Sequence, residues 1–280
     1  MLKDFFLRFP EGRARALTFS YDDGVEQDLR LRTLLDRYGL KGTFNLNSGL
    51  FTAPGETPAD PLIRRMTERQ VLEAFAGTPH EIGLHGLRHL YLEQLPPARA
   101  TYEILEDRAR LEALFHTLVR GGAYPYGTWN EQTLESLRAC GVDYFRTTED
   151  SHSFDVPQDW LRLAPTCHHN DPQLPALAER FLHDPVERRP YLFYIWGHSY
   201  EFERDDNWAL IENLAQTLSG RAEVYYATNG EVFDYVAAFR ALRISCDGRR
   251  VLNPTATPVW YVHCGRAGCV QPGEQVVLED

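Results

Sequence analysis

The stretch Ala16-Leu-Thr-Phe-Ser-Tyr-Asp-Asp-Gly24 determines how the rest of this chain is interpreted. Its apolar and β-prone residues predict a buried strand over 16–21, and two aspartates, Asp22 and Asp23, stand where that strand ends. An acidic pair after a strand is more often a turn or a helix cap than a functional site. The meaning of the pair therefore depends on which other side chains reach the same place.

A histidine pair follows in Glu81-Ile-Gly-Leu-His-Gly-Leu-Arg-His89, with His85 and His89 four residues apart. Taken alone, this spacing more often marks two unrelated surface histidines on one face of a helix. Together with the aspartates it supplies three metal ligands and a spare carboxylate, the minimum needed to activate a water molecule beside a divalent ion. The two stretches therefore favour a metal site.

Length and charge limit the classes of protein that the chain can represent. Its 280 residues suffice for one large domain, or for one domain with a small appendage. With 29 Lys+Arg against 40 Asp+Glu, the net charge is −11, so the chain lacks the basic footprint of a nucleic-acid-binding protein. The longest apolar stretches are strand-sized, so no membrane-spanning helix is expected. Residues 1–10 show no signal-peptide core, and we expect a cytoplasmic protein.

Lysine and cysteine usage narrows the choice of enzyme class. The only lysines are Lys3 and Lys41, and neither follows a strand, so a Schiff-base aldolase or a pyridoxal enzyme is nearly excluded. No G-x-S-x-G elbow and no P-loop is present. Cys167 next to His168 resembles a catalytic pair only in sequence. We expect reduced thiols at all five cysteines, which are residues 140, 167, 246, 264 and 269.

Short β-rich runs alternate with helical patterns over most of the chain. The expected strands are 16–21, 42–46, 81–84, 121–124, 144–147, 161–164, 191–196 and 223–227. The expected helices are 29–38, 97–118, 131–140, 207–218 and 231–242. This alternation predicts an α/β fold with a parallel sheet and helices outside it. A closed or distorted (β/α)7–8 barrel is the leading interpretation, and a doubly wound open sheet is the alternative.

The alternation of strand and helix patterns stops near residue 244. Asp247-Gly248 separates 242–246 from 249–252, which is typical of a hairpin, and 259–262 and 275–278 are expected to form two more short strands. We therefore expect residues 1–243 to form the barrel and 244–280 a small β-rich extension. A structural role or a part in a homo-oligomer is expected for this extension, rather than catalysis.

Polar residues cluster after the expected strands. They are Asp22, Asp23, His85, residues 124–127, Asp150, His152, Cys167, His168, His169 and His198. Parallel β/α folds place their sites at the carboxyl ends of the strands. Histidines scattered through a core would not all follow strand ends, so the sequence predicts one active-site rim.

The order of these motifs resembles the polysaccharide deacetylases, which are carbohydrate esterase family 4 with the NodB homology domain. The motifs are Thr18-Phe-Ser-Tyr-Asp-Asp-Gly24, His85-x-x-x-His89, Tyr124-Pro-Tyr-Gly127 and a late strand that ends in His198. The resemblance covers roughly residues 10–235, and its first two motifs are specific only in combination. It implies a distorted barrel and a hydrolase that removes N-acetyl groups from a sugar with the help of one divalent ion.

The resemblance implies roles for individual residues. Asp23, His85 and His89 would be the metal ligands. Asp22 would be the general base that takes a proton from the activated water. Two nitrogens and one carboxylate suit zinc, although cobalt, iron and manganese also accept such ligands.

The same resemblance implies a general acid and an oxyanion site. His198 would protonate the departing amine, and the backbone N–H of Tyr126 would stabilise the oxyanion. An Asp-Trp pair in the family supports the acidic histidine and lines the acetyl pocket. Asp159 and Trp160 have the right identities but lie far beyond the fifth strand, and Asp150 is the rival partner for His198. Trp160 is equally well interpreted as a core residue.

One departure from the family pattern concerns an arginine. The family's third motif usually begins with an arginine that positions the catalytic aspartate, and Ala123 stands there in this chain. Arg146, at the end of the next strand, is the nearest candidate to replace it by reaching across the rim to Asp22. A structural ion pair is an equally good interpretation of Arg146. For His168 and His169, a structural hydrogen bond is favoured over a role in substrate binding.

The sequence therefore predicts a metal-dependent amidohydrolase that acts on an N-acetylated carbohydrate. Without an export signal, a soluble oligosaccharide, a glycan precursor or a small acetylated metabolite fits better than an extracellular polymer. Two alternatives stay open. One is a cyclic ureide hydrolase of the allantoinase type on the same barrel, and the other is an inactive carbohydrate-binding barrel, suggested by Ala123. Neither a nucleic acid nor a membrane is expected as a partner.

Overall fold

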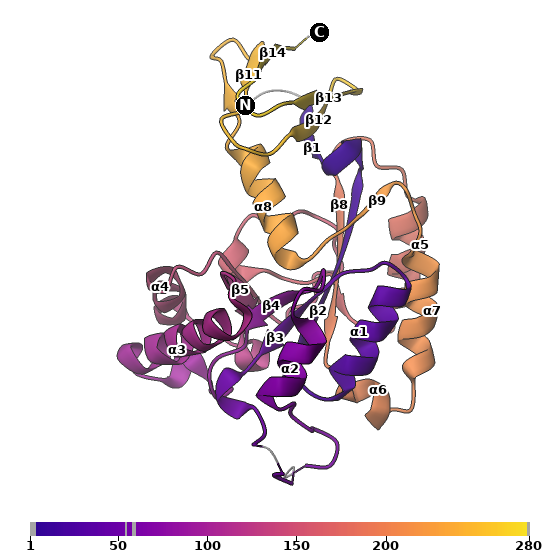
Figure 1. The fold of residues 1–280 in the computed structure, drawn as a ribbon. Coiled ribbons are helices and arrows are strands. Elements are labelled where there is room, and N and C mark those ends of the chain that lie inside the picture. The colour runs from indigo at the N-terminus through magenta and orange to yellow at the C-terminus, as the bar shows by residue number, and fades with distance from the viewer. Residues whose placement is uncertain (1–3, 54, 58–59, 279–280) are drawn as a thin grey trace.

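A parallel sheet curves through the centre of the molecule (Figure 1). The computed structural model describes residues 4–53, 55–57 and 60–278. The sheet order is β6-β5-β4-β3-β2-β8-β7, with β9 also paired to β2, and all of these pairings are parallel. Its strands are β2 (Arg15–Asp22), β3 (Gly42–Leu46), β4 (Glu81–Leu84), β5 (Gly121–Ala123), β6 (Tyr144–Arg146), β7 (Cys167–His168), β8 (Tyr191–Gly197) and β9 (Val224–Tyr226).

The segment before β7 connects the two edges of the sheet. Leu163 forms a parallel bridge with Arg146 of β6, and the backbone N–H of Thr166 donates to the Tyr194 carbonyl of β8 at 2.8 Å. The fold is therefore a distorted (β/α)7–8 barrel, as expected. The strand expected over 161–164 is wrong. The Asp159 side chain accepts from the backbone N–H of Leu161, and residues 160–162 form a 3-10 turn instead.

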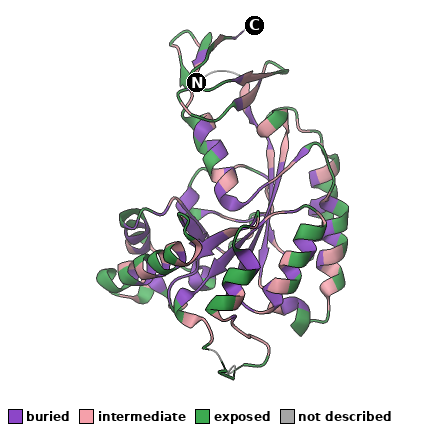
Figure 2. Ribbon diagram, viewed as in Figure 1, coloured by how far each residue is buried: buried purple, intermediate pink, exposed green. Residues whose placement is uncertain are grey.

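Helices cover the outside of the sheet, with their exposed faces toward solvent and their buried faces inward (Figure 2). Five of them match the expected helices to within a few residues, namely α1 (Gln27–Arg37), α3 (Pro97–Phe115), α4 (Glu131–Ala139), α7 (Trp208–Leu218) and α8 (Asn229–Arg240). Three others had not been expected, namely α2 (Glu68–Phe75), α5 (Leu174–His183) and α6 (Tyr200–Arg204). A capping box between Thr67 and Gln70 starts α2.

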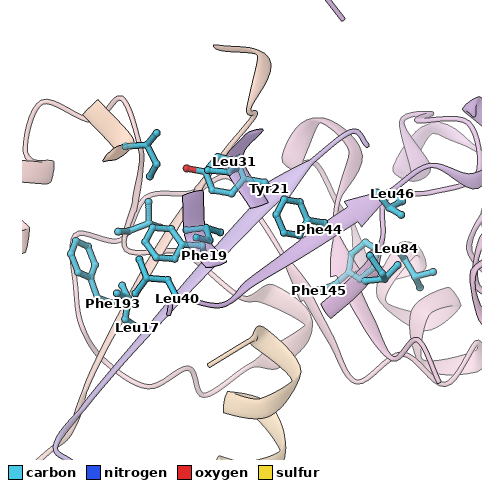
Figure 3. Close-up of a cluster of buried hydrophobic side chains, with 14 of the residues drawn as sticks. Leu17, Phe19, Tyr21, Leu31, Leu40, Phe44, Leu46, Leu84, Phe145 and Phe193 are labelled. Carbon is cyan, nitrogen blue, oxygen red and sulfur yellow. The ribbon is translucent and has the colours of Figure 1, made fainter. Parts of the chain in front are cut away.

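Strand β2 shows how the sequence pattern builds both the core and the site. Leu17, Phe19 and Tyr21 belong to the large core cluster that packs under the helices (Figure 3). Because strand side chains alternate, the intervening residues face the barrel interior. Truncation of a buried phenylalanine such as Phe19 costs about 3–5 kcal/mol, so this cluster holds the strand firmly. The last interior residue of the strand is Asp22.

The barrel interior is polar and hydrogen-bonded. Thr18 donates to the Asn229 side-chain oxygen at 2.9 Å, and the backbone N–H of Asn229 donates to Thr43 at 3.0 Å, so the start of α8 closes the bottom of the barrel. Higher up, the Asn45 amide donates to Ser20 at 2.9 Å. A side chain at Gly83 would collide with Asn45, which explains a glycine in the middle of β4.

The C-terminal extension forms two small antiparallel sheets, of order β1-β12-β13 and β10-β11-β14. Their strands are β1 (Phe5–Arg8), β10 (Arg243–Ile244), β11 (Arg250–Leu252), β12 (Val259–His263), β13 (Arg266–Val270) and β14 (Gln275–Val277). The hairpin and both later strands are confirmed, whereas β13 had not been expected. One boundary needs correction, because residues 5–8 pair with β12 instead of joining the barrel. Figure 1 shows the extension at the end where β2 and β8 begin, away from α6, which follows β8.

Three other features bear on the sequence-based expectations. Within the described residues, all five cysteines are unpaired. Lys41 forms an ion pair with Glu231 at 2.5 Å, whereas Lys3 lies outside the described residues. Among the described helices, none is long and apolar enough to cross a bilayer.

Candidate active site

The predicted rim exists at the carboxyl ends of the strands. Asp22 ends β2, Asp23 follows it, His85 follows β4 and His198 follows β8. The backbone of Asp23 has φ +87°, a strained value for a residue other than glycine. Its N–H donates to the Asn45 carbonyl at 3.0 Å. Strain of this kind persists where surrounding contacts hold it, and here it turns the Asp23 side chain toward the histidines.

Asp23, His85 and His89 bring their potential ligand atoms within 4.8 Å of one another. Oδ1 of Asp23 lies 3.9 Å from Nε2 of His85 and 3.6 Å from Nε2 of His89. Arg65 also approaches Asp23, donating to Oδ1 at 2.8 Å and to the backbone carbonyl. The set of one carboxylate and two imidazoles is typical of sites for zinc and similar ions.

The orientation of His85 provides a direct test of whether these residues fit a metal ion. Its Nδ1 lies 2.9 Å from the Ala123 carbonyl, so the ring proton belongs on Nδ1 and the lone pair on Nε2. Nε2 is buried and, within the part of the chain that the structure describes, has no hydrogen-bond partner. A metal-ligating histidine typically donates one ring N–H to a carbonyl or carboxylate and keeps the lone pair of its other nitrogen for the ion. The residues therefore fit a divalent ion.

The histidine pair does not lie on a helix. Residues 85–91 form a loop in which Gly86 and His89 both have positive φ, of +71° and +52°. The Asn47 side chain holds this loop by donating to the carbonyls of His85 and Gly86. Burial lowers the pKa of His85, and burial with the nearby His85 charge lowers the pKa of His89 to about 4. Both rings are therefore neutral near pH 7, as metal binding requires.

Asp22 is buried and bound on both carboxylate oxygens. Arg146 donates to Oδ2, and the Asn45 amide donates to Oδ1 at 2.8 Å. Burial alone would raise the pKa of Asp22, but the charges of Arg146, His85 and His198 outweigh it and hold that pKa below the ordinary value. The carboxylate is therefore ionised. Each oxygen keeps a further lone pair for another proton donor.

Arg146 occupies the position that the sequence analysis suggested for it. It is the register partner of Ala123 in the β5–β6 pairing, so a guanidinium reaches the site from the neighbouring strand. The side chain is fully buried, donates to the Thr147 carbonyl at 3.0 Å, and lies 4.4 Å from the centre of the Trp196 ring. Several partners thus fix the guanidinium, and the position expected for Arg146 is confirmed while its role stays a prediction.

His198 faces the aspartates with one nitrogen and a glutamate with the other. Nε2 lies 3.9 Å from Oδ2 of Asp22 and 4.0 Å from Oδ2 of Asp23. Nδ1 lies 3.7 Å from Oε2 of Glu201. Burial favours the neutral imidazole, but Glu201 and the two aspartates outweigh it and raise the pKa of His198. The ring is thus well suited to hold a proton close to the reacting groups.

The residues expected to support His198 lie elsewhere, and these predictions are corrected. Asp150 accepts a hydrogen bond from the Trp196 indole at 2.8 Å. Asp159 caps the 3-10 turn over residues 160–162 through the Leu161 N–H. Trp160 packs in the second core cluster, with its ring 5.2 Å from that of Phe233. Asp159 and Trp160 match the family's Asp-Trp pair in residue type only, because Asp159 accepts a hydrogen bond from a nearby backbone N–H.

Tyr126 lies in a strained turn at the edge of the site. Its φ of +60° is unusual for a bulky residue, and a side chain at the next position, Gly127, would collide with Thr148. The Tyr126 ring lies 4.4 Å from that of His89 and stacks on Tyr91 at 3.8 Å. The two tyrosines are 49% and 41% exposed. They therefore form an aromatic surface beside the candidate metal ligands.

A cavity of about 1050 Å³ opens next to the metal ligands. Ser48, Phe51 and Arg65 are among its lining residues. Because Arg65 also binds Asp23, the cavity and the histidine cluster share a wall. Asp23, His85 and His89 do not line this cavity, so it is a neighbour of the candidate site and not a part of it.

Three residues of the site were not identified from the sequence. Glu201 lies three residues after His198, and this spacing could have revealed it, because the backbone turns between them and the N–H of Glu201 donates to the His198 carbonyl at 3.1 Å. Trp196 lies on the same strand face as Tyr194, and strand alternation could have placed it at the interior. Arg65 comes from a loop, and no sequence pattern indicates its contact with Asp23.

Comparison with known proteins adds the following findings. The family model for polysaccharide deacetylases matches residues 10–145. "Putative polysaccharide deacetylase YxkH" of Bacillus subtilis (strain 168) is 26% identical over 139 residues, which cover 48% of this chain and 45% of that protein. The chain thus matches less than half the length of this curated relative.

Solved structures resemble the fold. A "putative polysaccharide deacetylase" from Mycobacterium smegmatis superposes with a TM-score of 0.57 at 16% identity, covering 84% of this chain and 94% of that one. A family 4 carbohydrate esterase from Streptomyces lividans, in complex with acetate, gives a TM-score of 0.49 at 18% identity, covering 76% and 92%. The similarity to the Mycobacterium structure extends beyond residues 10–145 and supports a shared barrel.

Proposed function

We propose that the chain is a member of the polysaccharide deacetylase family, whose model matches residues 10–145, and that it is a hydrolase that removes N-acetyl groups from a carbohydrate with the help of one divalent ion. The observation that carries the proposal is the convergence of Asp23, His85 and His89 beside a second, ionised carboxylate, that of Asp22. The alternative of an inactive binding barrel rested on the alanine at position 123. It is less favoured because Arg146 supplies the guanidinium that binds Asp22.

Asp23, His85 and His89 would hold the ion. Such an ion polarises a carbonyl oxygen and lowers the pKa of a water molecule from 15.7 toward about 7. One carboxylate and two neutral imidazoles suit zinc best, with cobalt, iron and manganese as alternatives. Ala123 contributes its carbonyl, which keeps the proton of His85 on Nδ1.

Asp22 would act as the general base. It receives the proton of the attacking water as the water oxygen bonds to the amide carbon. Arg146 and Asn45 hold its carboxylate from two sides, so the side chain does not have to be oriented when substrate binds. The two neighbouring aspartates thereby differ in role. Asp23 faces both histidines of the loop and Arg65, whereas both oxygens of Asp22 are held by Arg146 and Asn45.

His198 would complete the reaction as the general acid. Breaking the carbon–nitrogen bond leaves an amine, which is a poor leaving group unless a proton reaches its nitrogen. Nε2 of His198 lies near both aspartates and can deliver that proton. The backbone N–H of Tyr126, held in its strained turn, would stabilise the developing oxyanion. The products are acetate and the free amino sugar.

The surroundings of the site support a sugar substrate. Tyr91 and Tyr126 are large, partly exposed aromatic side chains beside the candidate site, and such side chains contribute much of the contact area in binding. We therefore propose an acetylated oligosaccharide or a polysaccharide segment as the substrate.

The test is a screen for acetate release over N-acetylated monosaccharides and oligosaccharides, with elemental analysis of the purified protein. We expect one divalent ion per chain, acetate release that stops after chelation, and recovery of activity when zinc is restored. Absence of bound metal, or turnover that chelation leaves unchanged, would overturn the proposal. Ring opening of a cyclic ureide without any acetate release would assign the barrel to another amide.

A further inference from the structure

Glu201 is the only carboxylate among the described residues that lies within 4 Å of Nδ1 of His198. Both atoms of this pair, Nδ1 of His198 and Oε2 of Glu201, are buried and lack a hydrogen bond of ordinary geometry within the described chain. At 3.7 Å the pair is slightly too long for a hydrogen bond. Catalytic pairs are often long in the absence of substrate and tighten when it binds. The geometry therefore indicates that Glu201 and His198 are placed to form a hydrogen bond once substrate is bound.

His168 approaches the same oxygen of Glu201. Nδ1 of His168 accepts a hydrogen bond from the backbone N–H of Asn170 at 3.1 Å. In the neutral ring the proton must then lie on Nε2, which is 3.0 Å from Oε2 of Glu201. The tautomer of His168 is thus set by the backbone, and it presents an N–H to the glutamate. The potential ligand atoms of His168, His198 and Glu201 lie within 4.8 Å of one another, but a metal ion at Nε2 of His168 would need a lone pair where the ring carries its proton. The close approach of His168 to Glu201 is therefore better explained by an N–H directed at the carboxylate.

His169 gives Glu201 a third imidazole neighbour. Its Nε2 lies 3.2 Å from the same carboxylate oxygen, and its ring stacks on Phe202 at 4.2 Å. The ring is fully buried, and it fits only because position 197 is a glycine, since a side chain at Gly197 would collide with it. Oε2 of Glu201 therefore lies among three imidazoles, with His168 and His169 close to it and Nδ1 of His198 at 3.7 Å.

We propose that Glu201 is the positioning residue for His198, and that His168 fixes Glu201. The inference rests on the proposed function, in which His198 protonates the leaving amine. Glu201 keeps a proton on Nδ1 of His198 and turns Nε2 toward Asp22 and Asp23, where the amine forms. The corresponding role of the carboxylate in a Ser-His-Asp triad is also to fix the tautomer and orientation of an imidazole. In this chain the carboxylate comes from the helix directly after the histidine.

Two measurements on the zinc-loaded protein test the inference. The first is acetate release by Glu201→Gln, which should lower kcat about 10²–10⁴-fold, the contribution of a general acid, while KM and zinc content stay unchanged. Glu201→Asp, which retains a carboxylate, should recover part of the loss. In the His198→Ala background, Glu201→Gln should cause no further loss, because residues that act as a unit are not additive. His168→Leu should lower kcat in the same direction.

The second measurement is ¹⁵N NMR of the His198 ring nitrogens, which does not depend on turnover. We expect a proton on Nδ1 in the wild type and its loss in Glu201→Gln, whose amide can donate where the glutamate accepted. The matched control is Glu203→Gln on the same helix, an exposed acid that binds Gln27 and Arg64, and it should leave both readouts unchanged. Unchanged kcat and unchanged His198 resonances in Glu201→Gln would overturn the inference. A wild type without acetate release would defeat the proposed function alone, because the NMR result would still decide the role of Glu201.

Discussion

Arg146 lies opposite Ala123 in the parallel register of β5 and β6, and its guanidinium binds the carboxylate of Asp22. The two neighbouring strands lie side by side at the rim, so a long side chain from either one can reach the same aspartate. The alanine at 123 does not leave the aspartate without a cation. Its backbone carbonyl instead serves His85.

Arg146→Ala should be severely damaging for both stability and turnover. It removes one partner of a buried ion pair and leaves Asp22 uncompensated, which typically costs about 3–5 kcal/mol. Thermal unfolding and acetate release measure the two effects. Arg146→Lys keeps the charge but loses the planar fork, so we expect it to be intermediate. Turnover unaffected by Arg146→Ala, in a protein that Asp22→Asn inactivates, would show that Arg146 is only structural.

Tyr91→Ala should weaken binding of oligosaccharides more than that of monosaccharides. Loss of the outer ring of the Tyr91–Tyr126 stack removes about 1 kcal/mol of aromatic contact, or roughly a fivefold rise in KM. Tyr91→Phe retains the ring and is the matched control. Comparison of KM for an acetylated trisaccharide and the corresponding monosaccharide provides the measurement. An equal change for both substrates would mean that the tyrosine pair does not contact a second sugar unit.

Asp28 should make the protein less stable as the pH rises. Burial, with the nearby charge of Asp23, raises the pKa of Asp28 to about 8, against about 3.9 in an unfolded chain. The folded state therefore binds the proton more tightly, so the stabilisation is complete below about pH 4 and is lost as the pH rises to about 8. Asp28→Asn should show a flatter profile over this range in thermal unfolding. Identical pH profiles for the two proteins would refute the raised pKa.

The strands and the rim could be predicted from the sequence because each depends on a local pattern. Alternation in β2 separates core residues such as Phe19 from interior ones such as Asp22, and a parallel sheet brings the strand ends together. The resemblance in motif order then separated the roles of Asp22 and Asp23. The first inference needs only the period of the strands, whereas the second depends on the resemblance to a known family.

The contacts that support the site could not be predicted in the same way. Asp159 and Trp160 have the residue types of the family motif, but the carboxylate caps a turn and the indole packs in a core cluster. The spacing of His85 and His89 suggested a helix, whereas they lie in a loop held by Asn47. Such contacts depend on which loop lies closest in space. A pattern within one segment does not contain that information.

The most direct test of the account compares Asp22→Asn with Asp23→Asn by measuring zinc content and acetate release on the same samples. If Asp22 is the general base and Asp23 is a metal ligand, Asp22→Asn should retain one zinc ion per chain but lose about 10²–10⁴-fold in turnover. Asp23→Asn should lose the zinc ion together with the activity. Retention of zinc by Asp23→Asn, or turnover near the wild-type value in Asp22→Asn, would contradict the account.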